Sequence, residues 1–361
     1  MLEKLASSRF YSYVLVLIIG LITLLAKFYL NGIMYGLDYS LFHPDGTLYT
    51  FRTLTWLGNS QEESSRLISS WYTTHAGKMT NVIPESLYFD SNPNWQLYKY
   101  RVLYSFISIP FVFFFGIYGM LFVPAISYIG LLIVILEIGR HYNKPEIAFI
   151  LITLFSMSIT ITRWMFINTT DSLFVFLASL STYLLVKWSP TRNWFFMQLV
   201  LVAAMSSTRV AIFYWIPICA VLFLKNRKQA ILLGLVSVFF FAPLFRANIV
   251  GTIGASSKEG SFFHQALSFF RDALKVLVVE FGQLLVLDRV LLFLAISAFI
   301  VSIAHLQNDS SRYFLALLTS TLLMSILNGT VGVNFRFELP ILASLTWVLL
   351  EITPPGRRFT R

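Results

Sequence analysis

A group of ionisable side chains lies close to the ends of apolar segments or in the single long polar stretch, and their types suit an anionic ligand. They are Asp38, His43, Asp45, Arg101, Arg163, Asp171, Arg209, Arg246, Arg336 and Glu338. Arg holds a phosphate through parallel hydrogen bonds, and a carboxylate can take a proton from a hydroxyl. Because an ionisable side chain near hydrocarbon is costly, it is usually paired, lines a cavity or is functional. The group therefore predicts a site for a phosphate-bearing ligand.

The stretch "YGLDYSLFHPDGTLYTFRTLTWLG" is the most informative part of the sequence. Pro44 and Gly46 predict a turn at Asp45, just before a short helix. Asp45 is thus a candidate general base, with an N-cap or Asx turn as the alternative, and Asp38 is a second candidate. His43 is a loop residue rather than a metal ligand, since no second His or Cys stands at ligand spacing.

The basic residues each have an ordinary alternative. An Arg or Lys near a helix end commonly snorkels, with its charge in the headgroup region. That alternative stays open for Lys99, Arg101 and Arg246. Arg163 and Asp171 could form only a structural ion pair across a tight turn. Arg209, in "MSSTRVAIFYW", has no acidic neighbour in sequence, so its partner must come from elsewhere in the fold or from a ligand.

The composition identifies the solvent of these segments as lipid. Of 361 residues, 57% are hydrophobic, 17% aromatic and 12% charged, a charged fraction about half that of soluble domains. Apolar runs of about 15 to 22 residues recur along the chain, which indicates an all-α polytopic membrane protein and excludes a soluble globular one. The single Cys219 excludes a disulfide framework. The net charge of +10 resides mostly in short links, which predicts cytoplasmic links rather than a nucleic-acid partner.

The charge bias gives a topology of about ten crossings, with both termini in the cytoplasm. A signal anchor from about Tyr11 to Leu30 precedes an extracytoplasmic loop, 31–101, with a short amphipathic helix around Glu62 to Trp71. The run from Val102 to Ile138 is too long for one crossing and is split at Gly116. If that run formed a hairpin instead, every later segment would have the opposite orientation, which the positive-inside bias disfavours.

The later crossings follow as Ile147 to Met165, Leu173 to Trp188, Trp194 to Thr208, Val210 to Leu224, Ala230 to Val250, Arg289 to Leu306, Tyr313 to Leu327 and Leu339 to Ile352. A second extracytoplasmic loop, 251–288, contains an amphipathic stretch from Phe262 to Leu287 that is expected to lie on the membrane surface. We expect one transmembrane domain, 1–361, in a plasma or bacterial inner membrane. Its site would lie on the extracytoplasmic side.

The polar motifs resemble, in their order, those of the C superfamily of glycosyltransferases, which use polyprenyl-phosphate sugars. The similarity is greatest to the bacterial and GPI-mannosyltransferase-type branches. It covers residues 10 to 225, with one later motif, and Ser105 and Val210 stand where the family often has Pro. The motifs are "PDGTLYTFRTLTWLG", "YKYRVLYSFISIPF", "NTTDSLFVFLASLSTYLL", "SSTRVAIFYWIPICAVL" and "VNFRFELPILASL".

The resemblance implies inverting sugar transfer from a polyprenyl phosphate to a lipid, glycan or protein hydroxyl. Asp45 matches the family's first-loop carboxylate and would be the general base, with Asp38 as the alternative. The residues expected to stabilise the leaving phosphate are Arg101, Arg209 and Arg336, with Lys99 as a further donor-binding candidate. The supporting residues would be Asp171, Arg163, His43, Tyr49 and Glu338. The chemistry requires no metal, although external Asp residues leave a divalent ion open.

Other functions stay open beside this one. A transporter or flippase of a lipid-linked sugar would also need basic residues near a phosphate, but it predicts paired halves with broken helices, which are not evident in the sequence. A non-catalytic membrane subunit of envelope polysaccharide assembly would use the long loop for docking. A membrane acyltransferase would need a His at membrane depth, which the sequence does not place there. The sequence leaves the oligomeric state open.

Overall fold

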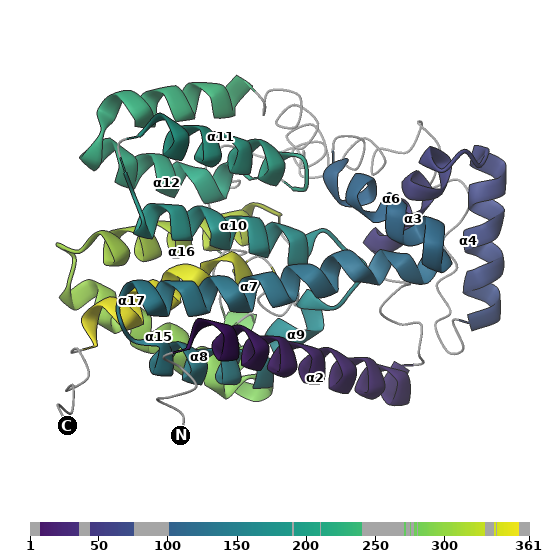
Figure 1. The fold of residues 1–361 in the computed structure, drawn as a ribbon, viewed down its shortest axis with the longest axis horizontal. Helices are drawn as coiled ribbons and strands as arrows, with labels where there is room; N and C mark the ends of the chain where they lie inside the picture. Colours follow the sequence, from purple (N-terminus) through teal and green to yellow (C-terminus); the bar gives the residue numbers. More distant parts are fainter. Residues whose placement is uncertain are drawn as a thin grey trace.

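The computed structural model describes residues 8–35, 44–75, 101–189, 191–209, 211–239, 281–328 and 338–353, together with residues 271, 275, 278, 279 and 336. Within these ranges the regular structure is entirely helical, so the all-α prediction is confirmed for them (Figure 1). The longer helices run roughly along the long axis of the molecule.

The described helices have the following bounds. They are α2 Arg9–Tyr35, α3 Pro44–Trp56, α4 Gln61–His75, α6 Leu103–Phe115, η2 Gly116–Leu121, α7 Phe122–His141, α8 Pro145–Met157, α9 Ile159–Met165, α10 Asp171–Val186, α11 Arg192–Ser206, α12 Ile212–Lys225, α15 Arg289–Ala304, α16 Asp309–Asn328, η3 Leu339–Ile341 and α17 Leu342–Ile352. A further helix covers residues 227–239.

Helix α7 lies at the centre of the bundle and packs against α2, α8, α10 and α17. Gly130 of α7 lies close to α10, because a Cβ atom there would lie 2.5 Å from the ring of Phe176. Two buried hydroxyls of α10 donate within their own helix, Ser179 Oγ to the Val175 carbonyl at 2.7 Å and Thr182 Oγ1 to the Ala178 carbonyl at 3.0 Å. Such local bonds satisfy polar groups in an apolar interior without a partner from another helix.

The apolar helices support a membrane-embedded protein. Two stretches, Arg9–Leu30 and Leu103–His141, are long and apolar enough to cross a bilayer, and a bent pair, Pro145–Met157 with Ile159–Met165, is a third candidate. Large apolar side chains cover the outside, including Leu25 at 68% exposure and Phe114 at 74%. A surface of this kind matches hydrocarbon rather than water. The count of ten crossings stays a prediction.

The predicted division at Gly116 is confirmed. Gly116 has φ 60°, a left-handed conformation that favours glycine, and it separates α6 from η2. Beyond it the chain folds back so closely that a Cβ atom on Gly119 would lie 2.3 Å from the backbone of Phe111. The apolar run therefore forms two segments rather than one long rod.

The predicted crossing from Ile147 to Met165 is interrupted, because α8 and α9 meet at an angle of 76°. Ser158 at the break has an extended backbone, with ψ 120°, and its hydroxyl caps α9 by accepting from the Ile161 amide. Asp288 Oδ2 accepts hydrogen bonds from Ser158 Oγ and, at 3.0 Å, from the Thr160 amide. A carboxylate from a distant segment thus accepts hydrogen bonds from donors at the bend that have no partner within the helix.

The first predicted loop contains more helix than expected. Helix α2 continues to Tyr35, beyond the predicted loop start, and the amphipathic helix expected around Glu62 is confirmed as α4. Asp45 lies within the first turn of α3 rather than in a turn before it. Residues 36–43, 76–100 and 240–270 lie outside the described residues. In the second predicted loop, 281–287 is helical.

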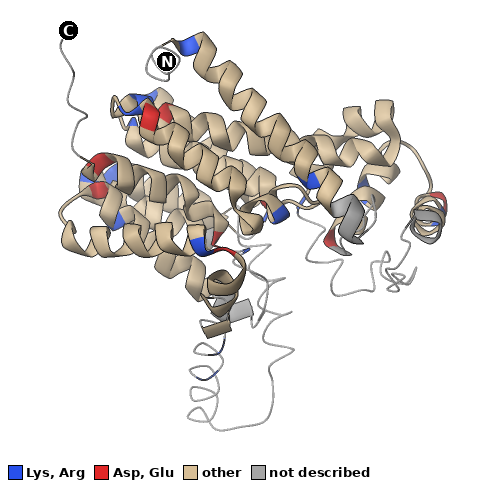
Figure 2. Cartoon of the chain, turned by 90° about the horizontal axis from the view of Figure 1, so that it is seen from below, with Lys and Arg blue, Asp and Glu red and all other residues tan. Residues whose placement is uncertain are grey.

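Several links that were predicted to share one side of the membrane lie at one end of the bundle. Arg140 Nη2 donates to the Arg9 carbonyl at 3.2 Å. Lys144 Nζ donates to the carbonyls of Leu350 and Thr353. The start of α2, the link between α7 and α8, and the end of α17 are therefore neighbours. Figure 2 shows charged residues mostly in groups at helix ends, with long uncharged stretches between them.

Candidate functional site

Four ionisable side chains from separate parts of the chain form one network, here called the ion cluster: Asp45, Asp171, Arg209 and Arg336. Arg209 Nη1 donates to Asp171 Oδ1. Arg336 donates to Asp171 Oδ2 through Nε at 2.9 Å and through Nη2 at 2.7 Å. The same Nη2 donates to Asp45 Oδ2 at 2.6 Å. Arg336 therefore bridges the two carboxylates, and Asp171 bridges the two guanidinium groups.

The members of the ion cluster differ in their access to solvent. The side chain of Asp171 is 1% exposed and that of Arg209 is 7% exposed. The corresponding fractions are 11% for Arg336 and 25% for Asp45. Asp45 is thus the carboxylate of the cluster that a ligand reaches most readily, whereas Asp171 is enclosed by protein.

The turn before α10 positions Asp171 and binds α3 at the same time. Thr169 Oγ1 donates to Asp171 Oδ2 at 2.7 Å. Asn168 Nδ2 donates to the Gly46 carbonyl at 3.2 Å and to Thr50 Oγ1 at 2.9 Å. The Tyr104 hydroxyl donates a hydrogen bond to Asn168 Oδ1 at 2.8 Å. The fully buried Asn168 side chain therefore joins α3, α6 and the turn.

The close approach of α3 to this turn requires glycine at position 46. A Cβ atom there would lie 2.2 Å from the Asn168 carbonyl oxygen, which no neighbouring backbone can accommodate without moving. Asp45 is the adjacent residue, in the first turn of α3, where the positive end of the helix dipole stabilises a carboxylate. Tyr49, one turn further, meets the Tyr104 ring edge to face at 5.3 Å. Its hydroxyl lies 3.4 Å from Thr170 Oγ1.

The charges of the ion cluster balance, and further arginines lie beside it. Burial lowers the pKa of the Arg209 guanidinium to about 10, with the positive charge of Arg336 as the second cause, and the nearby Arg101 contributes as well. Arg209 is still protonated at neutral pH. Arg52 of α3 donates to the Arg101 carbonyl at 3.1 Å. Among the described residues, Arg101 and Arg52 therefore add positive charge beside the balanced cluster.

Lys27 and Arg163 extend this positive region. The guanidinium of Arg163 lies 5.5 Å from the Trp164 ring centroid, and that of Arg336 lies 4.6 Å from the same centroid. Lys27 of α2 is close enough to Arg163 for their charges to repel. Within the described ranges neither has a carboxylate at 4.0 Å or less. The alternative in which Arg163 pairs with Asp171 is therefore not seen there.

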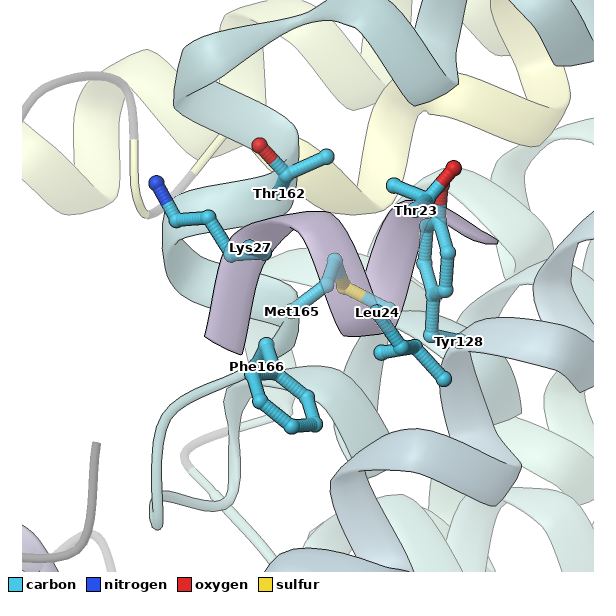
Figure 3. A pocket seen from close by; sticks show the side chains of 7 residues that line it. All are labelled: Thr23, Leu24, Lys27, Tyr128, Thr162, Met165 and Phe166. Atoms are coloured by element: carbon cyan, nitrogen blue, oxygen red, sulfur yellow. The ribbon is translucent and has the colours of Figure 1, made fainter. Parts of the chain in front are cut away.

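A narrow pocket adjoins Lys27 (Figure 3). It is lined by Thr23, Leu24, Lys27, Tyr128, Thr162, Met165 and Phe166, and it leaves no room for a water molecule. Figure 3 shows the Lys27 amino group on the side of the Thr162 hydroxyl, away from the rings of Phe166 and Tyr128. The Lys27 amino group therefore points away from the apolar side chains that line the pocket.

The structure brings together most of the predicted site residues that it describes. Asp45, Asp171, Arg209 and Arg336 form the ion cluster, with Arg101 and Tyr49 beside it. Glu338 is fully buried at the start of η3, within electrostatic range of Tyr214, which also neighbours Arg209. Asp38, His43, Lys99 and Arg246 lie outside the described residues.

Some residues around the site were not predicted. Lys27 stands inside an apolar run, where a lone Lys usually indicates snorkelling. Arg52 follows the flagged Asp45 by seven positions but was assigned no role. Asn168 begins the acceptor pattern "NTT", yet its buried amide is engaged by α3 and could not carry a glycan.

Within the described ranges, no three His, Cys, Asp or Glu residues are placed to hold a metal ion. Asp45 and Asp171 bind guanidinium groups instead. Comparison of this chain with protein-family models, with curated proteins and with solved structures finds no match.

Proposed function

We propose that the protein is an integral membrane glycosyltransferase that moves a sugar from a polyprenyl-phosphate donor to a hydroxyl of a lipid, glycan or protein, with inversion at the anomeric carbon. The observation that carries the proposal is the ion cluster, in which a partly exposed carboxylate is fixed by a buried Arg–Asp–Arg network at one end of an apolar bundle. The resemblance of the motifs around these residues to the C superfamily supplies the reaction.

The difference in exposure assigns the roles of the two carboxylates. Asp45, at 25% exposure, is accessible to an acceptor and is the proposed general base. Asp171, at 1% exposure, cannot touch an acceptor and is a positioning residue that orients Arg209 and Arg336. Arg336 in turn fixes the Asp45 carboxylate from one side, which limits its orientations before the acceptor arrives.

The reaction is a single displacement. The acceptor oxygen forms a bond to the anomeric carbon while the bond from that carbon to the donor phosphate oxygen breaks. The acceptor proton passes to the Asp45 carboxylate, and the polyprenyl phosphate leaves with the bonding electron pair. Negative charge develops on the leaving phosphate, so donors placed in advance lower the barrier.

Lys27 and Arg163 are the best described candidates to hold that phosphate. They neighbour each other, and the described residues provide no carboxylate to neutralise them. Arg163 shares the Trp164 ring with Arg336, so the pair adjoins the ion cluster. Arg209 and Arg336 are occupied by Asp171 and are assigned to positioning. Arg101 and Lys99 remain proposed contributors.

The test is transfer of radiolabelled sugar from a panel of polyprenyl-phosphate donors in membranes containing the wild type, Asp45→Asn or Asp309→Asn, with donor binding measured in parallel. Asp309 is a matched control because it is also partly exposed, at 32%, and forms an ion pair with Lys225 at 2.7 Å. We expect Asp45→Asn to abolish turnover with donor binding retained, and Asp309→Asn to keep both.

Other outcomes would redirect the proposal. Donor binding without turnover in the wild type would identify a carrier of lipid-linked sugars or a subunit of an assembly. Turnover that survives in Asp45→Asn would remove Asp45 as the base, and Asp38→Asn would then be measured. Loss of donor binding in Lys27→Gln with Arg163→Gln, but not in Asp45→Asn, would support the assignment of the phosphate-binding pair.

A further inference from the structure

Helix α9 is short, yet it carries Arg163, one residue of the proposed phosphate-binding pair. It has seven residues, Ile159–Met165, and it follows α8 at an angle of 76°. A helix of this length has little stability of its own, so tertiary contacts determine where it lies. The position of Arg163 therefore depends on the contacts that fix α9.

Asp288 fixes the beginning of α9 and the beginning of α15 with one carboxylate. Its Oδ2 atom accepts hydrogen bonds from Ser158 Oγ and, at 3.0 Å, from the Thr160 amide. Its Oδ1 atom accepts a hydrogen bond from the Leu291 amide at 3.1 Å. Ser158 Oγ in turn accepts from the Ile161 amide at 3.1 Å. Both carboxylate oxygens are thus occupied by the first turns of two helices that are distant in sequence.

The buried charge of Asp288 is unusual for a helix cap. The residue is 5% exposed, and within the described ranges no Lys, Arg or His nitrogen lies at 4.0 Å or less from its carboxylate. A buried carboxylate is costly, and a neutral Ser, Thr or Asn is an equally common cap. Hydrogen bonds to an ionised acceptor are, however, about twice as strong as neutral ones. The charge therefore favours a rigid α9 more than capping alone requires.

The far end of α9 reaches the ion cluster. Arg163 lies in its last turn, and the adjacent Trp164 is 5% exposed, so this ring is packed in the interior. The Arg163 guanidinium lies 5.5 Å from the Trp164 ring centroid, and that of Arg336 lies 4.6 Å from it. A displacement of α9 would therefore move Arg163 relative to Arg336.

Helix α9 also packs against α2 at Lys27. Thr162 and Met165 of α9 line the same narrow pocket as Lys27, and no water molecule fits between them (Figure 3). The Thr162 hydroxyl donates to the Ser158 carbonyl at 2.7 Å, which ties this contact to the beginning of α9. Because the packing is tight, a movement of Ser158 would change the separation of Lys27 and Arg163.

We propose that Asp288 is a positioning residue for the donor phosphate, which holds α9 so that Arg163 stays beside Lys27 and the ion cluster. The inference rests on the proposed function, in which Lys27 and Arg163 bind that phosphate. Asp288 itself does not touch the donor, because its two oxygens are occupied by α9 and α15.

The first measurement needs no ligand. Spin labels are attached at Lys27→Cys and Arg163→Cys in the Cys219→Ala protein, and their dipolar coupling is measured by electron paramagnetic resonance in detergent. We expect one narrow distance distribution. Asp288→Asn should broaden it, because the Asn amide nitrogen would face a donor in place of one carboxylate oxygen.

Two further variants calibrate this result. Ser158→Ala keeps the carboxylate and its bond to the Thr160 amide, so it should broaden the distribution less than Asp288→Asn. Asn226→Ala removes a helix cap elsewhere, since Asn226 Oδ1 accepts from the Gln229 amide at 3.2 Å. This matched control should leave the distribution unchanged.

The second measurement is the affinity of the purified full chain for undecaprenyl phosphate, with undecaprenol as the uncharged control lipid. Asp288→Asn should weaken binding of the phosphate about tenfold, the loss of one charged hydrogen bond, and leave undecaprenol binding unchanged. In an Arg163→Gln background the same substitution should cause no further loss, because Asp288 acts through Arg163. A merely structural role would give losses that add.

The outcomes separate the inference from the proposed function. If the wild type did not bind undecaprenyl phosphate, the proposed function would be wrong, and with it the donor role of Asp288. If the wild type bound it, but Asp288→Asn left the distance distribution unchanged or its loss added to that of Arg163→Gln, only the role of Asp288 would be overturned. Should Asp288→Asn fail to fold, Ser158→Ala gives both measurements, with smaller effects in the same direction.

Discussion

Asp171 is the residue on which the ion cluster depends, because it accepts hydrogen bonds from Arg209, Arg336 and Thr169 while only 1% exposed. Removing its charge leaves a buried guanidinium without its counterion, which costs about 3–5 kcal/mol. Asp171→Asn should therefore lower the thermal unfolding temperature of the purified protein in detergent strongly. Asp45→Asn, at a 25% exposed position, should cost about 1 kcal/mol.

The comparison of these two variants is decisive because each changes one carboxylate to its amide. If they destabilised the protein equally, Asp171 would not be the carboxylate on which the stability of the ion cluster depends. Lost activity in Asp171→Asn at a temperature where the protein stays folded would show that the orientation of the arginines, and not only stability, depends on Asp171.

Arg336 offers a prediction about geometry rather than charge. Its Nε and Nη2 atoms both reach Asp171, while Nη2 also reaches Asp45. A Lys keeps the charge but has a single ammonium on a flexible stem, which cannot reproduce this fork. Arg336→Lys should therefore lose about 1–2 kcal/mol in the same unfolding measurement. A stability equal to that of the wild type would show that charge alone suffices.

At the residue scale, the sequence could identify the members of the ion cluster but not their pairing. An ionisable side chain beside an apolar run was sufficient reason to select Asp45, Asp171, Arg209 and Arg336. Their contacts span 38, 165 and 291 positions, and nothing local specifies such partners. Arg209 was predicted to need a distant partner, and Asp171 supplies it. Lys27 was missed because a Lys in an apolar helix commonly has no ligand.

At the scale of elements, the contact between α3 and the turn before α10 sets the position of Asp45. A Cβ atom at position 46 would meet the Asn168 carbonyl oxygen at 2.2 Å. Gly46→Ala should force the two segments apart and destabilise the protein by about 1–3 kcal/mol. The matched control is Gly234→Ala, since that glycine is helical and has nothing within 4 Å of its Cβ position.

The control should be neutral or gain up to about 1 kcal/mol from the better helix propensity of Ala. Thermal unfolding of both variants in detergent gives the two values. A loss for Gly234→Ala that matched the loss for Gly46→Ala would mean that the close contact is not the cause.

The two breaks within apolar runs show what element boundaries could be predicted. The break at Gly116 followed from length, since the run exceeds one bilayer crossing, and glycine marked the place. The break at Ser158 lies within a run of ordinary length, with no Gly or Pro beside it. It depends on hydrogen bonds from Ser158 and Thr160 to Asp288, about 130 positions away. A sequence window cannot include such a partner.

At the scale of the whole molecule, the charge bias predicted which links lie together. The Arg140–Arg9 and Lys144–Leu350 contacts gather links that were all assigned to one side. The ion cluster joins α3, the turn before α10 and the link after α11, which were assigned to the other side. The positive-inside rule predicts which links lie at the same end of the bundle, because it assigns each short link to a side from its own charges. It contains no information on which helices pack together.

The sidedness itself is tested by labelling with a membrane-impermeant maleimide in intact cells. The starting protein is Cys219→Ala, since Cys219 is the only cysteine. Arg66→Cys and Lys228→Cys are then made separately, at exposed positions of α4 and of the helix of residues 227–239. We expect Arg66→Cys to react in intact cells and Lys228→Cys only after the cells are opened, because α4 belongs to the predicted extracytoplasmic loop. Reaction of both in intact cells would reject the topology, and the reverse pattern would place the ion cluster in the cytoplasm, where an extracytoplasmic acceptor could not reach Asp45.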